Sequence, residues 1–431
     1  MITTNQRKFL RRQLTAIGAA IIVGALPPAA VRADDASKPS QPPARWVDGI
    51  TLSAQIDVGV TVNPSDPTDD KNFGRLFDDK TNEVLLNHLI ITAQRPIDST
   101  SKGYDFGFKF QGMYGSDSRY THFLHEFENV THDLNQLDVV EANVQVHAPW
   151  FTDGGVDIKA GQYVTMEGAE TIDSTTNIFY SHSYIFNFGI PFKHTGLLAV
   201  LHANPMFDLY VGINSGVNTT LGGGDNNDEP AFHGGIGLNL LDGKLITLAT
   251  THIGPENATG ALPNGLNANS QIRYLNDITT VWKATDKLTL ISDLNYIHDD
   301  ALNVGKAATG YGGALYGSYS LNDVFSPAIR FEVWRDEDGA FVAQSGNNVD
   351  FVRFEEGRPT LSGRTVGGGR TTYGAITFGV NIKPGLTIPH LASVVLRPEI
   401  RYDASLNDTK PFNDSKDNDM VTVAVDAVIC F

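Results

Sequence analysis

The side chains that could do chemistry in this sequence are charged, and they recur at short, regular intervals. Three acidic residues stand three positions apart in one polar segment, at Glu167, Glu170 and Asp173. Basic and acidic residues alternate at every second position in two other stretches: Arg330, Glu332, Arg397, Glu399 and Arg401. Carboxylates that face guanidinium groups across water set up an electric field, and such a field sorts ions by charge.

Patterns typical of enzymes and metal sites are missing or incomplete in this sequence. The G-x-S-x-G turn that presents a serine nucleophile does not occur. His122, His125 and Glu126 are close together, but they match neither H-E-x-x-H nor H-x-x-E-H. We interpret this stretch as a polar loop. The sequence therefore predicts no catalytic residue, no metal site and no cofactor.

A strict alternation of apolar and polar residues indicates that β-strands position the charges. In residues 50–62 every even position is apolar and no odd position is, which is typical of a strand with one oily face. Sixteen segments are predicted as strands on this basis: 49–62, 83–95, 103–115, 136–148, 155–166, 192–204, 207–217, 231–241, 244–254, 271–284, 287–298, 308–320, 325–336, 371–383, 391–403 and 420–431.

The links between these strands alternate between short and long. Strands of this length match a tilted membrane crossing of about 9–11 residues. Short turns on one side and long loops on the other are typical of outer-membrane barrels. We therefore predict an all-β fold, a transmembrane antiparallel β-barrel of about 16 strands with short periplasmic turns and long extracellular loops. The alternative is a soluble all-β protein with one core face.

The first residues have the pattern of a secretory signal peptide. A basic start, an apolar run over residues 14–26 and small residues at Val31 and Ala33 predict cleavage after residue 33. Arg11 and Arg12 leave twin-arginine export open. Residues 34–48 are predicted to be a flexible periplasmic leader, and 49–431 the barrel. Cleavage would change the net charge from −17 to −22, which argues against nucleic acid as a partner.

One stretch, residues 160–196, resembles the putative beta-barrel porin-2 family, the OmpL-like porins of Gram-negative bacteria. The similar elements are AGQY at 160–163, GAE at 168–170, SHSY at 181–184 and PFKHTG at 191–196. His182 is a departure, because arginine is more usual there. The resemblance implies passive diffusion of solutes through an outer-membrane barrel, without naming a substrate.

The resemblance also implies where the charges lie. In sixteen-stranded porins the third long loop folds into the barrel, which would bring Glu167, Glu170, Asp173 and His182 to a pore constriction. Strand parity turns a second set of side chains toward the lumen wall: Lys109, Arg330, Glu332, Arg397, Glu399 and Arg401. We predict a mild cation preference from the acidic charge. The alternative is that these charges only keep the lumen solvated and paired.

The last strand predicts an assembly signal. Ile429 and Phe431 fall on its lipid face, and the final aromatic residue resembles the signal by which the barrel assembly machinery accepts its clients. The predicted partners are outer-membrane lipid, lipopolysaccharide, this machinery and small hydrophilic solutes, and a homotrimer is left open. Two other functions also stay open, a structural or adhesin-type barrel plugged by its loops and an outer-membrane barrel enzyme.

Overall fold

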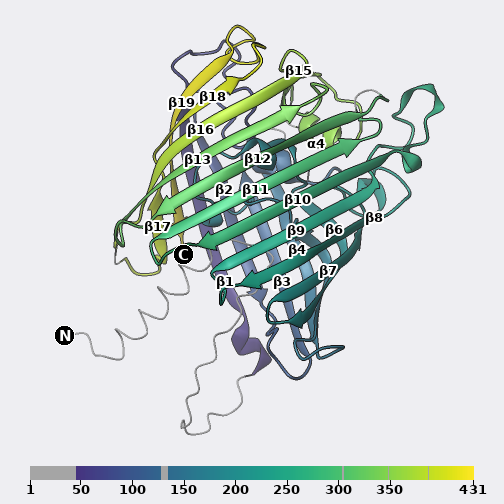
Figure 1. The fold of residues 1–431 in the computed structure, drawn as a ribbon, viewed down its shortest axis with the longest axis vertical. Coiled ribbons are helices and arrows are strands. Elements are labelled where there is room, and N and C mark those ends of the chain that lie inside the picture. Colours follow the sequence, from purple (N-terminus) through teal and green to yellow (C-terminus); the bar gives the residue numbers. More distant parts are fainter. Residues whose placement is uncertain (1–44, 128–133, 303–304, 348, 387) are drawn as a thin grey trace.

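The protein is a closed antiparallel β-barrel. The computed structural model describes residues 45–431 except 128–133, 303–304, 348 and 387, so the predicted signal peptide and most of the predicted leader lie outside the described residues. Strands that follow one another around the barrel pair antiparallel, and the last strand pairs antiparallel with the first, which closes the ring. Figure 1 shows the tilted strands of this ring.

The strands of the barrel agree with the sixteen predicted ones. They are β1 (Thr51–Val62), β2 (Val84–Arg95), β3 (Asp105–Gly115), β4 (Gln136–Ala148), β5 (Val156–Val164), β6 (Lys193–Asn204), β7 (Phe207–Asn214), β8 (Ala231–Leu240), β9 (Leu245–Pro255), β10 (Ile272–Lys283), β11 (Leu288–Asp299), β12 (Ala308–Tyr319), β13 (Phe325–Asp336), β16 (Thr371–Ile382), β17 (Ser393–Leu396), β18 (Glu399–Ser405) and β19 (Asp419–Cys430). The largest difference in a boundary is at β7, which ends at Asn214 rather than at residue 217.

The predicted strand 391–403 is interrupted, and its two halves are β17 and β18. Both halves keep the same register on β19, with Leu396 opposite Ala427 and Glu399 opposite Ala424. Pro398 lies in the gap and has no N–H group to donate to the ladder. The two halves therefore form one crossing of the barrel, which brings the number of crossings to sixteen.

The described connections contain short helices and one hairpin that the sequence did not predict. The helices are η1 (Trp46–Gly49), α2 (Ser118–Thr121), η2 (Ser174–Thr176), α3 (Tyr184–Phe188), η3 (Gly222–Gly224), η4 (Pro263–Gly265), η5 (Ala268–Ser270) and α4 (Asp350–Glu355), and the hairpin is β14 (Ala343–Ser345) with β15 (Arg364–Val366). Among the described residues, no helix has the length and hydropathy needed to cross a membrane.

The outer face of the barrel is apolar and exposed. Leu294, Leu315 and Phe331 are about half exposed although each lies in the middle of a strand. Aromatic residues stand near both ends of the strands, for example Trp282 at the end with short turns and Tyr274 at the end with long loops. An apolar band between aromatic girdles is what a barrel presents to lipid.

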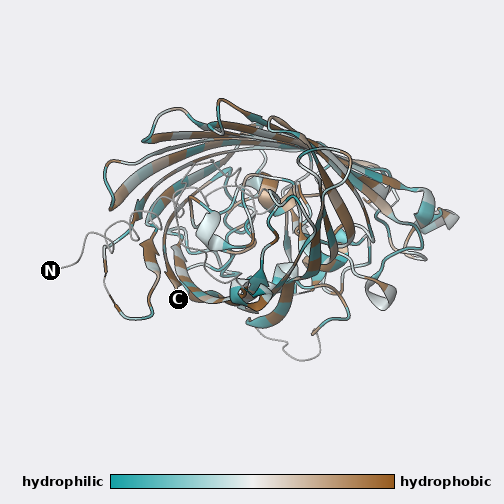
Figure 2. Cartoon of the chain, turned by 90° about the horizontal axis from the view of Figure 1, so that it is seen from below, coloured by the Kyte–Doolittle hydropathy of each residue, from teal (hydrophilic) through white to brown (hydrophobic). Residues whose placement is uncertain are grey.

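The interior at the long-loop end is filled by the chain itself. Figure 2 shows chain segments inside the ring of strands. Phe77 comes from the connection between β1 and β2, and Phe186 and Phe192 come from the one between β5 and β6; their rings pack with centroids 4.9–5.9 Å apart. Trp334 on β13 and Phe351 on α4 belong to the same buried cluster. The long connections thus build a hydrophobic core within the barrel, which strand parity alone did not predict.

One carboxyl group in this filling should make stability depend on pH. Burial raises the pKa of Glu355 to about 7, although Arg273 and Arg364 act in the opposite direction. The folded chain then holds this proton to a higher pH than the unfolded chain does. The stabilisation is complete below about pH 4.5, where glutamate titrates in unfolded chains, and it is lost as the pH rises through 7.

We therefore expect the melting temperature in detergent to fall between pH 5 and pH 8, and Glu355→Gln to reduce that fall. Glu337→Gln is the matched control, because a hydrogen bond from Arg335 lowers the pKa of Glu337 and keeps it charged throughout. An unchanged slope in Glu355→Gln would contradict the assignment.

Candidate functional site

The third long connection, residues 165–192 and here called loop 3, crosses the inside of the barrel. Near its middle, the Tyr180 hydroxyl donates to Asn87 Oδ1 on β2 at 3.0 Å. Near its start, the Gly168 N–H donates to Asp277 Oδ1 on β10 at 3.1 Å. β2 and β10 stand on opposite sides of the ring of strands. Loop 3 therefore spans the lumen between these strands.

Arginines of the wall hold the backbone of loop 3 through its carbonyl groups. Each is buried and donates to at least one carbonyl oxygen of the loop: Arg330 to Ser181 at 2.7 Å, Arg397 to Ser174 at 2.8 Å and to Asn177 at 2.9 Å, and Arg401 to His182 at 2.6 Å. A guanidinium group has five donors in a fixed fork, so it can satisfy several buried acceptors at once. These arginines thus replace the partners that the backbone of an irregular loop lacks.

Wall carboxylates hold the same backbone through its N–H groups. Glu332 accepts from the Tyr184 N–H at 2.7 Å, and Glu399 accepts from the Tyr180 N–H at 2.9 Å. Asp293 on β11 accepts from the Ala169 N–H at 2.9 Å, in the same way as Asp277 on β10. The sequence analysis missed these two aspartates, although their place on the polar face of β10 and β11 was a usable signal.

Two predicted partners, Glu170 and Arg330, are in direct contact rather than across a gap. Glu170 Oε1 accepts from Arg330 Nη1 at 2.7 Å and from the Tyr316 hydroxyl at 3.1 Å. Glu170 Oε2 accepts from the Ser183 N–H at 2.7 Å. Both Glu170 and Arg330 are buried. This ion pair joins loop 3 to β13 directly, and there is no water-filled space between its two charges.

His182 also packs within the loop instead of facing water. Its ring stacks on Phe186, with centroids 4.1 Å apart. Burial, followed by the nearby guanidinium groups of Arg330 and Arg397, holds the pKa of His182 well below its ordinary value. His182 is therefore a neutral packing residue, and its backbone oxygen receives Arg401.

Open space lies between loop 3 and the wall made by β3 and β4. A cavity of about 160 Å³ is lined on the wall by Lys109, Gln111 and Glu141, and on the loop by residues that include Glu170 and Asp173. Ile246, Leu248 and Val281 contribute an apolar side from β9 and β10. This cavity combines free volume with charged groups inside the barrel.

Two of the predicted site residues, Lys109 and Asp173, line this cavity and remain partly exposed. Lys109 is paired with Glu141 at 2.6 Å, and 25% of its side chain remains exposed. Asp173 is half-buried, accepts from Gln55 Nε2 at 2.8 Å and caps η2 through the Thr175 N–H. Of the predicted basic wall residues, Lys109 thus faces the cavity, whereas Arg330, Arg397 and Arg401 are buried against loop 3.

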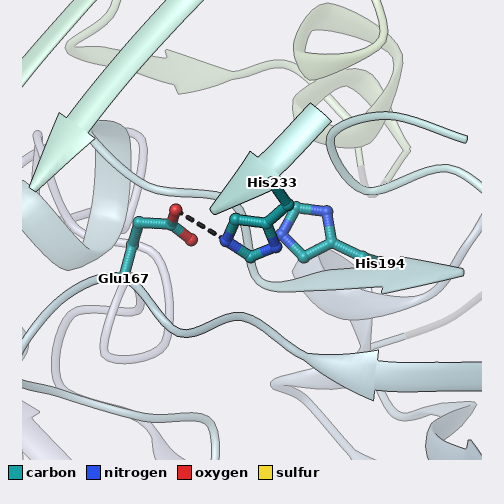
Figure 3. Close-up of side chains that lie close together, drawn as sticks. All are labelled: Glu167, His194 and His233. Carbon is teal, nitrogen blue, oxygen red and sulfur yellow. Dashed lines mark hydrogen bonds and ion pairs between the residues drawn. The ribbon is translucent and has the colours of Figure 1, made fainter. Parts of the chain in front are cut away.

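Glu167 takes part in a cluster that the sequence analysis did not foresee. It lies beside His194 on β6 and His233 on β8, and one nitrogen or oxygen atom from each residue lies within 4.8 Å of the others (Figure 3). Glu167 Oε1 and His233 Nε2 are 2.8 Å apart. The three residues are far apart in the sequence, so only the strand register reveals that they meet.

Comparison with known proteins settles the family. The family model described as putative beta-barrel porin-2, OmpL-like, matches residues 49–431. The chain belongs to the porin-2 family. No curated protein matches this porin-2 chain significantly.

Solved structures with a fold similar to that of the porin-2 chain include outer-membrane porins and channels. The outer membrane channel DcaP of Acinetobacter baumannii is 12% identical, with 89% of this chain and 97% of that chain covered and a TM-score of 0.52. The anion-selective porin from Comamonas acidovorans is 10% identical, with 89% and 99% covered and a TM-score of 0.54. OmpF of Salmonella typhi, in complex with daunomycin, is 11% identical, with 89% and 98% covered and a TM-score of 0.53. At these identities the likeness shows the fold of the porin-2 chain and no more.

Proposed function

We propose that this chain is an outer-membrane porin through which small hydrophilic solutes and ions diffuse passively. The observation that carries this proposal is the cavity beside loop 3, inside a closed barrel and bordered by Lys109, Glu141 and Asp173. Charged groups and free volume inside a lipid-facing barrel are what a water-filled constriction requires. Its family and its fold neighbours are porins and channels rather than enzymes.

The proposed selectivity is a mild preference for cations. The acidic net charge of the chain favours cations over the whole barrel. At the cavity itself, the positive charge of Lys109 lies next to the negative charges of Glu141 and Asp173, so these three groups leave a small negative excess. The anion-selective porin from Comamonas acidovorans has a similar fold. Side chains, and not the fold, would therefore set the sign of the preference.

Reversal potentials in a planar bilayer under a salt gradient test this proposal. We expect the unmodified barrel to favour cations slightly, Lys109→Gln to increase that preference and Asp173→Asn to reduce it, because each change removes one charge from the constriction. Lys244→Gln is the matched control, since Lys244 is exposed in the short turn between β8 and β9. Clear anion preference in the unmodified barrel, or equal shifts in all three variants, would reject the proposed selectivity.

A barrel closed by its own loops, with a structural or adhesive role, is the second candidate function. The aromatic core that fills the long-loop end favours it, because Phe77, Phe186 and Phe192 leave little room for water between their rings. Single-channel recording separates the two functions. Stepwise conductance supports the porin, whereas a folded barrel that inserts and passes no current supports the closed barrel.

The location and partners of the chain are also proposed. An exposed apolar outer face supports residence in the outer membrane, in contact with lipid and lipopolysaccharide, after export by the signal peptide 1–33 and with 34–48 as the leader. Recognition of Ile429 and Phe431 by the barrel assembly machinery would fit their places on the strand that closes the ring, where Ile429 pairs with Ile56. A homotrimer remains compatible with this face.

A further inference from the structure

The cluster at the start of loop 3 brings together ligand types that suit a transition metal. His194 and His233 stand on β6 and β8, with β7 between them, and their rings are 4.6 Å apart. Gly212 on β7 lies directly opposite His233. Glu167 enters from loop 3, three residues after β5 ends. Three separate segments thus converge on one point.

The hydrogen bonds around the cluster fix its rings, and His194 Nε2 lies 3.2 Å from the Thr165 hydroxyl, a contact that a bound metal would replace. His194 Nδ1 lies 3.0 Å from the Gly216 carbonyl oxygen, to which only a protonated Nδ1 can donate, so Nε2 of the neutral ring carries the lone pair. A backbone carbonyl that fixes the far nitrogen in this way is the usual support of a metal-binding histidine. His194, His233 and Glu167 are almost fully buried, and His233 Nδ1 has no hydrogen-bond partner.

From this geometry we propose that Glu167, His194 and His233 form a binding site for a divalent transition metal of the zinc type. Two imidazoles and one carboxylate are a common zinc ligand set, and a fourth position then stays open for water. Imidazole also suits copper and nickel, whereas magnesium and calcium prefer all-oxygen sites. The cavity beside loop 3 gives the ion a route, because Thr165 and Glu167 line it.

The bound ion would tie the start of loop 3 to the wall. Glu167 belongs to the start of the loop, His194 to β6, which begins where the loop ends, and His233 to β8. At present a single contact of 2.8 Å joins Glu167 to His233. A metal would replace it with bonds to both histidines. The metal ion would then hold the start of loop 3, and how firmly the loop is held would depend on the concentration of that ion.

Zinc binding to the refolded full-length barrel, prepared without a histidine tag and freed of metal with a chelator, tests the site. We expect one Zn²⁺ per chain in calorimetric titration and a melting temperature that rises with the zinc concentration, because ligands that bind only the folded state stabilise it. His233→Gln and His194→Gln should each weaken zinc binding by more than about 10–100-fold. That range is the usual cost of losing a residue that only hydrogen-bonds to a metal ligand.

His298→Gln is the matched control, because His298 on β11 contacts Thr309 and lies outside the cluster. It should bind zinc as the unmodified chain does. No binding by the unmodified chain, or equal binding by His233→Gln and the unmodified chain, would overturn the proposal.

The absorption spectrum of Co²⁺ in the unmodified barrel gives a second answer that needs no variant. Strong visible bands indicate a four-coordinate site with nitrogen ligands, and a weak octahedral spectrum would overturn the proposal even if the histidine variants fail to fold.

Discussion

Replacing Arg330 with alanine should destabilise the barrel by about 3–5 kcal/mol, the usual cost of removing one member of a buried ion pair. Arg330 is fully buried, and it holds Glu170, the Ser181 carbonyl oxygen and Glu332 together. Without it, two carboxylates and one backbone acceptor lose a partner away from water. Urea denaturation of the barrel in lipid vesicles measures the change in the free energy of unfolding.

The same substitution should also alter conduction, because Arg330 is one of the groups that hold loop 3 at β13. A freed loop moves in the lumen, so we expect noisier single-channel current with a changed mean conductance. Arg335→Ala is the control on the same strand, since the Arg335 side chain is partly exposed and pairs with Glu337. That change should cost at most about 1 kcal/mol.

A double variant separates loss of the arginine from general damage to the barrel. Adding Glu170→Gln to Arg330→Ala removes one of the carboxylates that the single variant leaves unpaired, so it should restore part of the lost stability. Full stability of Arg330→Ala, or a further loss in the double variant, would show that the contact between β13 and loop 3 does not have the role assigned to it.

Replacing Leu294 with arginine should destabilise the barrel by about 2–4 kcal/mol in a lipid bilayer, because the new charge faces the hydrocarbon. Leu294 is in the middle of β11, and 53% of its surface is exposed in the isolated chain. A soluble protein would tolerate this change within about 0.5 kcal/mol, because an exposed surface position contacts only water. The measurement therefore tests whether the outer face lies against lipid.

Leu321→Arg is the control for the lipid-facing variant. Leu321 is exposed to the same degree, 53%, but it lies in the short turn between β12 and β13. Its replacement should change stability by no more than about 1 kcal/mol, the value typical of positions near the interface. Equal costs at Leu294 and Leu321 would speak against a membrane-spanning barrel.

The sequence predicted the wall of the barrel well because lipid and lumen impose a period of two on every strand. The predicted strands 244–254 and 308–320, for example, are present as β9 and β12. The single interruption, at Pro398, follows from a missing N–H group. Parity predicts Arg330, Arg397 and Arg401 on the inner face because it depends only on position along a strand, and the three side chains are buried against loop 3.

The contents of the barrel were harder to predict. Parity gives the direction of a side chain but not the distance to what it meets, so Arg330 was expected across water from Glu170 instead of in contact with it. The metal-type cluster depends on register between β6, β7 and β8, and no local pattern around His194 or His233 reports that register. Phe77 packs against Phe186, and these residues lie in two different loops. Loops have no periodic sequence pattern from which such a contact could be predicted.

Arg397 has a consequence for the order in which the molecule can fold. It stands beside the seam of the ring, where it contacts Asp426 on β19 and lies 3.5 Å from Asp57 on β1. It also reaches the Ser174 carbonyl oxygen of loop 3, a contact that joins residues 223 positions apart in the chain. Contacts of such long range form late, since a large loop must first close. A ring that sealed with loop 3 outside would leave Arg397 without the Ser174 and Asn177 carbonyl oxygens, so we expect the loop to enter before the first and last strands meet.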